Sequence, residues 1–264
     1  MKTIRRIIVI SLFSYTAAGI ALFFMQTQMI YLPDDRKLAD CSLPEGVEFW
    51  QQGEEHGLLG ADGNANLLVF FHGNADMACD WRYLGVNHLN PLGYDVLVVE
   101  YPGYGGDGRK PSKLLIEGTI DTSYNWVAQQ DYDKIVVMGY SLGTGAAAIY
   151  ADRYGADQVI LFAPFDSIYN VARGQGMVYP RALLTEDFDN IASLATVDAD
   201  ISILHGQDDK VIPASHSARL AIELQAMGRS VNRVVLTGLG HQDLFTGPIF
   251  DMFLQDVLPS GSGR

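Results

Sequence analysis

The hydrophobic positions of the chain form short apolar runs separated by longer stretches with helical spacing. The short runs are rich in β-branched residues, as in strands that are covered on both faces. They lie at 66–71, 94–99, 135–138, 158–162, 201–204 and 231–236. Helical stretches lie at about 79–89, 113–129, 142–154, 214–227 and 248–257. This alternation predicts an α/β fold with a mostly parallel central sheet and helices on both faces.

Two segments depart from this rhythm. Residues 36–66 are short polar and apolar stretches with several glycines, which predict a small antiparallel edge before the parallel strands. Residues 165–198 are mixed and contain Gly174, Gly176 and Pro180, which predict a lid-like insertion over the top edge of the sheet. The globular domain is therefore expected at 30–258, followed by a polar tail at 259–264.

The N-terminal segment predicts a membrane anchor within residues 1–29. Ile7–Met25 has 19 residues without a charge, and a helix of that length spans about 28 Å, close to the hydrocarbon core of a bilayer. Lys2, Arg5 and Arg6 precede it, so the N-terminus should be cytoplasmic and the rest extracytoplasmic. A cleaved signal peptide ending near Ala17-Ala18-Gly19 is the alternative.

Charge and cysteine content narrow the class of protein further. The formal charge of −13 argues against nucleic-acid binding and against electrostatic attraction to anionic lipid. No Cys/His spacing resembles a metal site and no glycine loop resembles a P-loop, so we expect neither a metal nor a cofactor. Export would permit a disulfide between Cys41 and Cys79, and two free buried thiols are the alternative.

A G-x-S-x-G motif lies between the run at 135–138 and the alanine-rich helical stretch. It reads Gly139-Tyr140-Ser141-Leu142-Gly143. Glycines two residues before and after the serine remove the clashes of a sharp strand-to-helix turn, which exposes the hydroxyl of Ser141 and aims the amide of Leu142 toward it. This context predicts a nucleophilic serine.

Acyl transfer by serine also needs a histidine, an acid that orients it and amides that hold an oxyanion. The loop after the run at 201–204 supplies Asp208 and Asp209 as candidate acids. His241 lies beyond that loop and just after the last strand, in the chain order Ser, Asp, His that this arrangement requires. The second oxyanion amide, beside that of Leu142, would come from Asn74 or Ala75, after the strand ending at Phe71.

Assembled in this way, the chain from Tyr31 to Val257 resembles the α/β-hydrolase superfamily. It is most similar to a membrane-anchored "bud-emergence" group related to the α/β-hydrolase-domain depalmitoylases. The shared motifs are His72-Gly73-Asn74-Ala75, Tyr101-Pro102-Gly103-Tyr104-Gly105, the G-x-S-x-G, His205-Gly206 with an acid three residues later, and Gly240-His241. The resemblance implies Asp209 as the acid. The predicted export of the domain departs from depalmitoylases that act in the cytosol.

These observations predict a membrane-anchored serine hydrolase of a carboxylic ester or acyl thioester, acting through Ser141, His241 and Asp209. A peptidase of the prolyl-oligopeptidase kind and a non-catalytic membrane-tethered binding module are the alternatives. An acyl pocket could be walled by side chains of the serine motif and the insertion. They are Tyr140, Tyr169, Met177, Tyr179 and Leu184.

Overall fold

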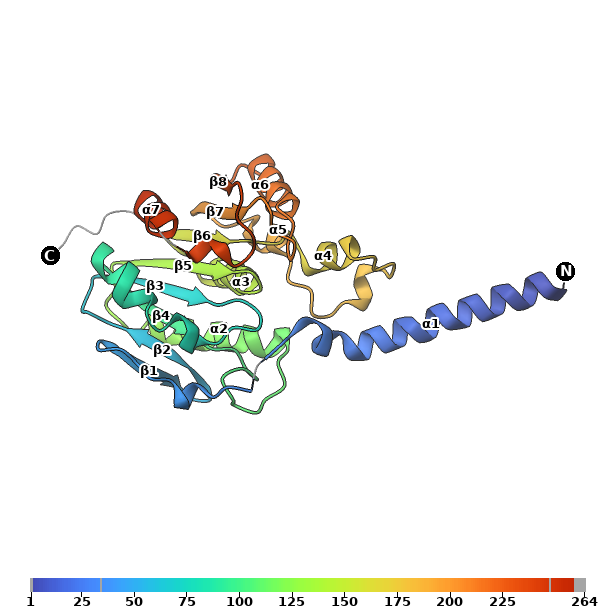
Figure 1. Ribbon diagram of the computed structural model, residues 1–264, viewed down its shortest axis with the longest axis horizontal. Helices are drawn as coiled ribbons and strands as arrows, with labels where there is room; N and C mark the ends of the chain where they lie inside the picture. Colours follow the sequence, from blue (N-terminus) through green and yellow to red (C-terminus); the bar gives the residue numbers. More distant parts are fainter. Residues whose placement is uncertain (1, 34, 247, 259–264) are drawn as a thin grey trace.

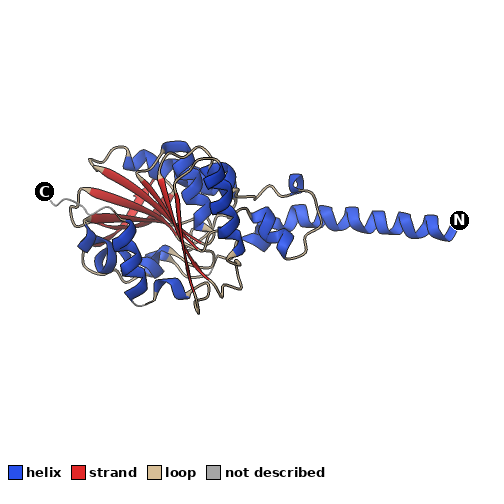
Figure 2. Cartoon of the chain, turned by 90° about the horizontal axis from the view of Figure 1, so that it is seen from above, coloured by secondary structure: helices blue, strands red, loops and turns tan. Residues whose placement is uncertain are grey.

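The structure, a computed structural model, describes residues 2–33, 35–246 and 248–258. An eight-stranded sheet runs through the globular part in the order β1-β2-β4-β3-β5-β6-β7-β8 (Figures 1 and 2). The strands are β1 Val47–Gln52, β2 Glu55–Gly60, β3 Asn66–Phe71, β4 Tyr94–Val99, β5 Lys134–Tyr140, β6 Gln158–Phe162, β7 Asp200–Gly206 and β8 Val231–Leu236. Strands β3 to β8 pair in parallel, whereas β1 and β2 form the predicted antiparallel edge.

Helical segments cover both faces of the sheet (Figure 2). The α-helices of the described residues are α1 Lys2–Ile30, which projects away from the sheet, α2 Lys113–Val127, α3 Gly143–Tyr154, α4 Ile168–Gly174, α5 Asn190–Leu194, α6 Ser215–Ala226 and α7 Pro248–Val257. Side chains of α2, α3, α5 and α6 pack with one face of the strands, while those of α7 and the short turns after β3 and β8 pack with the other. This two-sided covering explains why β3, β4 and β6 are buried along their whole length.

The helical stretch expected at about 79–89 does not form a continuous α-helix. The chain instead forms short 3₁₀ turns, η2 Ala78–Trp81 and η4 Asn90–Leu92, and a π-helical turn, η3 Gly85–Leu89. Gly85 lies against β4, where a Cβ atom would come 2.7 Å from the Cγ1 of Val96. Gly85 and Pro91 both disfavour a continuous α-helix, and the close packing on β4 selects short turns instead.

Helix α1 projects from the globular part, and the insertion 165–198 lies along its second half (Figure 1). By length and composition α1 is able to cross a membrane, and almost none of its most apolar stretch is buried by the rest of the chain. The insertion contains α4, the 3₁₀ turn η5 Arg181–Leu183 and α5. Its contacts with α1 include a ring stack between Tyr15 and Tyr179, with ring centres 4.6 Å apart.

Cys41 and Cys79 form a disulfide whose Cα atoms are 5.8 Å apart. It joins the segment before β1 to the turn η2 that follows β3. Of the two states that the sequence left open, the structure has the paired one. The polar tail expected at 259–264 lies outside the described residues.

Candidate active site

The turn between β5 and α3 holds Ser141 in a strained backbone conformation. Its φ angle is 53°, in the left-handed region that few non-glycine residues adopt. A Cβ atom at Gly139 would come 2.4 Å from the carbonyl oxygen of Gly143, and one at Gly143 would come 2.0 Å from that of Phe71. The two glycines therefore allow the turn to close, and Ser141 stands at the end of β5 with its amide donating to Phe162 O at 2.9 Å.

The structure brings Ser141, His241 and Asp209 together. The Nε2 atom of His241 lies 2.9 Å from Ser141 Oγ, and its Nδ1 lies 2.6 Å from Asp209 Oδ2. A carboxylate at this distance favours the tautomer with a proton on Nδ1, which leaves Nε2 free to accept the hydroxyl proton of Ser141. Asp208 is exposed, so Asp209 alone of the two candidates reaches the imidazole.

Four donors surround the buried carboxylate of Asp209. Its Oδ1 accepts from the amides of Val211 and Ile212, both at 2.8 Å, and its Oδ2 is also 3.2 Å from His205 Nε2. That nitrogen carries a proton, because it also contacts the carbonyl oxygen of Ile212 at 2.8 Å and a carbonyl can only accept. Burial opposes ionisation, but the hydrogen bonds from His205, His241 and Ile212 together hold the pKa of Asp209 well below its usual value.

The role of His205 was not foreseen from the sequence, where this residue stands out only as part of the His205-Gly206 motif. It is fully buried at the end of β7 and supports the acid rather than the nucleophile. Its place directly before Gly206, where a strand enters the acid loop, is the signal that could have found it.

The loop after β3 is fixed by a second buried histidine. His72 Nε2 lies 2.8 Å from Glu100 Oε1, and its Nδ1 lies 2.8 Å from Gly73 O. Because the Glu100 carboxylate and the Gly73 carbonyl oxygen both accept hydrogen bonds, both ring nitrogens of His72 carry a proton. Burial lowers the pKa of His72, yet the charge and hydrogen bond of Glu100 outweigh burial and leave that pKa raised. Glu100 also accepts from the amide of Ala78, which ties this loop to the end of β4.

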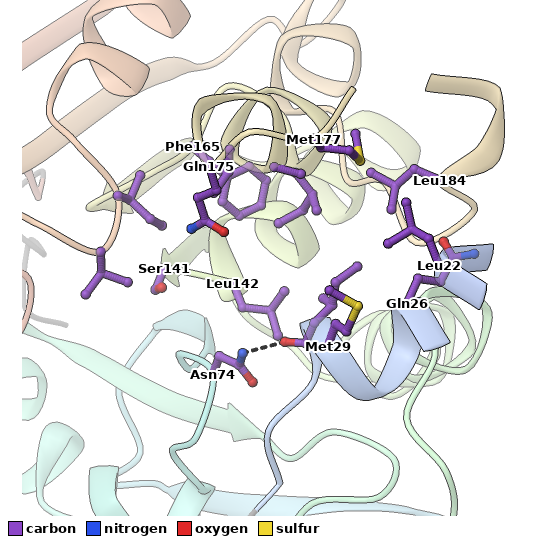
Figure 3. A pocket seen from close by; sticks show the side chains of 16 residues that line it. Leu22, Gln26, Met29, Asn74, Ser141, Leu142, Phe165, Gln175, Met177 and Leu184 are labelled. Atoms are coloured by element: carbon purple, nitrogen blue, oxygen red, sulfur yellow. Dashed lines mark hydrogen bonds between the residues drawn. The ribbon is translucent and has the colours of Figure 1, made fainter. Parts of the chain in front are cut away.

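Asn74 connects this loop to the end of α1. Its side-chain nitrogen donates to Ile30 O at 2.6 Å (Figure 3), and its side-chain oxygen accepts from the hydroxyl of Tyr104 at 2.6 Å. The side chain of Asn74 therefore holds this loop against the end of α1 and against Tyr104. Leu142, the residue before the first turn of α3, lines the same cavity as Asn74 and Ser141.

A cavity of about 270 Å³ adjoins Ser141 (Figure 3). Of the insertion residues named from the sequence, Met177 and Leu184 line it. Its other walls come from α1, the insertion and the acid loop. They include Leu22, Gln26, Met29, Ile30, Phe165, Ile168, Val171, Ala172, Gln175, Val211 and Ile212.

Three of the expected pocket residues are not part of its lining. Tyr140 packs beside His241, with ring centres 5.2 Å apart, and its hydroxyl donates to His241 O. Tyr169 is held through its amide by Asp187, and Tyr179 stacks on Tyr15. These three aromatic side chains build the structure around the cavity and are not part of its lining.

The family model for the alpha/beta hydrolase fold matches residues 66–198, and the chain belongs to that family. An uncharacterized protein of Mycobacterium tuberculosis is 28% identical over 261 residues, which cover 92% of this chain and 90% of that protein. The human alpha/beta hydrolase domain-containing protein 17B is 28% identical over 187 residues, covering 67% of this chain and 60% of that protein. The fold supports an enzyme of the hydrolase class.

Solved structures agree on the fold. A CIB-like hydrolase from Thermoplasma acidophilum matches with a TM-score of 0.56 and 19% identity, covering 80% of this chain and 98% of that one. The acylaminoacyl peptidase of Pyrococcus horikoshii matches with a TM-score of 0.61 and 13% identity, covering 86% of this chain and 43% of that one.

Alanine substitutions at two helical glycines should have opposite effects on stability. Gly143→Ala places a methyl group against the backbone of β3 and should lower the free energy of unfolding by about 3 kcal/mol. Gly118→Ala, in α2 with no atom near the new methyl group, should raise it by about 0.5–1 kcal/mol. Denaturant unfolding of the detergent-solubilised chain measures both, and a Gly143→Ala protein as stable as wild type would contradict the close packing.

Stability should also depend on the ionised state of Asp209. A lowered folded-state pKa adds stability above the ordinary carboxyl value of about 3.9, and this contribution is lost as pH falls toward the lower folded value. The Asp209→Asn variant has no carboxyl group at this position that could titrate. The wild-type advantage in unfolding midpoint over this variant should therefore shrink between about pH 6 and pH 3. An advantage that is constant or grows on acidification would contradict the assigned hydrogen bonds.

Proposed function

We propose that the chain is a membrane-anchored serine hydrolase that cleaves a carboxylic ester or acyl thioester. The observation that carries the proposal is the continuous line of contacts from Ser141 Oγ through the His241 ring to the buried Asp209 carboxylate. A packed protein core has no need of this arrangement at a cavity wall, whereas acyl transfer requires it. A binding module that had lost the chemistry would have no reason to keep all three side chains in register.

The reaction follows from the positions of these groups. Ser141 Oγ attacks the acyl carbon while His241 Nε2 takes its proton, and the carbonyl oxygen becomes an oxyanion. When the carbon–oxygen or carbon–sulfur bond breaks, His241 returns the proton to the departing alcohol or thiol. Water then attacks the acyl-enzyme, again giving a proton to His241, which passes it back to Ser141 Oγ as the carboxylic acid leaves. Asp209 stays ionised and stabilises the imidazolium in both halves.

The backbone amides of Leu142 and Asn74 are the proposed oxyanion donors. Leu142 lies at the N-terminus of α3, where amides point outward and the helix dipole favours negative charge. Asn74 is supported by the His72–Glu100 pair and by its own bond to Ile30 O. Rigid support of this kind matters because the donors must already be in place when the charge develops.

The cavity favours an acyl substrate over a peptide. Apart from Ser141, its polar lining residues are Gln26, Asn74 and Gln175, and the remainder are apolar. Such a surface recognises a hydrocarbon chain rather than a hydrogen-bonding peptide backbone.

The topology that we propose places the N-terminus in the cytoplasm and the hydrolase domain outside it. Lys2, Arg5 and Arg6 precede the apolar run of α1, and the disulfide between Cys41 and Cys79 favours an oxidising compartment. The contact of Tyr15 with the insertion supports an uncleaved anchor, because cleavage near Gly19 would remove it.

Substitutions in the three central side chains should abolish turnover without unfolding the protein. Ser141→Ala and His241→Ala should each lower kcat for p-nitrophenyl esters by several orders of magnitude, roughly 10⁴ to 10⁶-fold. Asp209→Asn should lower kcat roughly 10⁴-fold, because His241 would then no longer be held in the tautomer with its proton on Nδ1. The matched control is Asp208→Asn, which alters an exposed carboxylate and should have only a small effect on kcat. The reverse ranking of the two aspartates would contradict the assignment.

The orientation can be tested with a reporter fused to the C-terminus. A reporter that is active only outside the cytoplasm should be active on the wild-type chain, because the basic residues before α1 stay inside. Replacement of Lys2, Arg5 and Arg6 by glutamine is the control and should reduce that activity. A reporter active only in the cytoplasm would refute the proposed orientation.

A further inference from the structure

The second half of α1 forms one wall of the cavity that contains Ser141. Leu22, Gln26, Met29 and Ile30 line it from α1. In Figure 3 the cavity extends from Ser141 at one end to Leu22 and Leu184 at the other. The segment that enters the membrane is therefore part of the site as well as a tether.

Gln26 joins α1 to the insertion through buried hydrogen bonds. Its side-chain oxygen accepts from the amides of Thr185 at 2.8 Å and Glu186 at 3.3 Å, and its nitrogen donates to Phe23 O at 2.7 Å. The residue is 4% exposed. Since its polar atoms are already engaged, the far end of the cavity presents a hydrocarbon surface to a ligand.

The insertion follows α1 toward the membrane. The hydroxyl of Tyr179 donates to Tyr15 O at 2.9 Å, and its ring lies so near Gly19 that a Cβ atom there would be 2.9 Å away. The neighbouring Val178 is 64% exposed, although its side chain is apolar. These contacts fix the tip of the insertion to the middle of the apolar run.

The position of Tyr15 along α1 determines how deep the tip of the insertion lies in the bilayer. Tyr15 precedes Met25, the end of the uncharged run, by ten residues, which is about 15 Å of helix. A hydrocarbon core is about 30 Å thick. With Ile7–Met25 in the bilayer, the contact between Tyr15 and Tyr179 lies close to the bilayer midplane, at the inner limit of the outer leaflet. The far end of the cavity, at Leu22 and Leu184, then lies within that leaflet.

We infer that the cavity receives the acyl chain of a bilayer-resident ester lipid, which enters from the outer leaflet between α1 and the insertion with its carbonyl at Ser141. This inference rests on the proposed serine hydrolase activity. The volume of about 270 Å³ is near the lower end of ligand pockets, roughly 300–1,000 Å³. The site therefore takes one acyl chain rather than a lipid with two chains side by side.

A bulky side chain at the far end tests where the acyl chain lies. In the full chain reconstituted in phosphatidylcholine vesicles, Leu22→Trp should lower the ratio of kcat/KM for p-nitrophenyl decanoate over p-nitrophenyl acetate by roughly tenfold or more. Leu184→Trp, from the opposite wall, should do the same. Phe24→Trp is the matched control on α1, because Phe24 is 75% exposed and does not line the cavity. Its ratio should stay within roughly twofold of wild type.

The outcomes separate the two proposals. If wild type hydrolyses p-nitrophenyl acetate in a Ser141-dependent way but both tryptophan variants keep the wild-type ratio, the acyl-chain site is refuted and the hydrolase survives. If the wild-type protein hydrolyses neither ester, the proposed function itself fails. Thermal unfolding of each variant in the same vesicles ensures that a lowered ratio is read only from folded protein.

The route of entry is tested by the location of the substrate. Long-chain p-nitrophenyl palmitate held in the same vesicles as the protein should be hydrolysed roughly tenfold faster initially than the same ester supplied in separate vesicles. Equal initial rates would show that the ester reaches Ser141 through water, which would overturn entry from the leaflet.

Discussion

The close approach of α3 to the ends of β3 and β5 is the constraint on which the site depends. It is possible because Gly139 and Gly143 carry no side chains where backbone atoms would otherwise collide. The same approach holds Ser141 at a positive φ angle and places Gly143 against the backbone of Phe71 and His72, where the loop after β3 begins. The parallel sheet supplies the rest, since the loops that follow β3, β5, β7 and β8 all leave from one edge.

Two buried histidine–carboxylate contacts support opposite sides of this site. On one side, His205 shares the Asp209 carboxylate with His241. On the other, His72 pairs with Glu100 beneath the loop that carries Asn74. Buried charges add little net stability, but removing one partner leaves the other uncompensated. Such pairs are therefore suited to fixing geometry, which is what a preorganised site requires.

The sequence was sufficient for the sheet, the strand-to-helix turn and the three side chains that meet there. Each of these depends on local pattern or on chain order, which residue types reveal directly. Partners that are distant in the chain could not be foreseen. Glu100 beneath His72 and the α1 wall of the cavity arise from tertiary packing, since Gln26 and Thr185 are 159 residues apart.

The tyrosines illustrate the same limit. Hydrophobic residues in the insertion were expected to face a pocket, and Met177 and Leu184 do so. Tyr179 lies in the same insertion, two residues after Met177, yet it packs on Tyr15 of α1. The pattern of apolar residues indicates that a side chain is buried, but it does not indicate against which surface the side chain packs.

The most direct measurement is covalent labelling of the purified protein with a fluorophosphonate, followed by mass spectrometry of the peptide that contains Ser141. The account predicts one phosphonate adduct on Ser141 Oγ and its loss in His241→Ala, because the hydroxyl then has no base. A folded wild-type protein that is not labelled at Ser141, or one labelled equally with and without His241, would contradict the account.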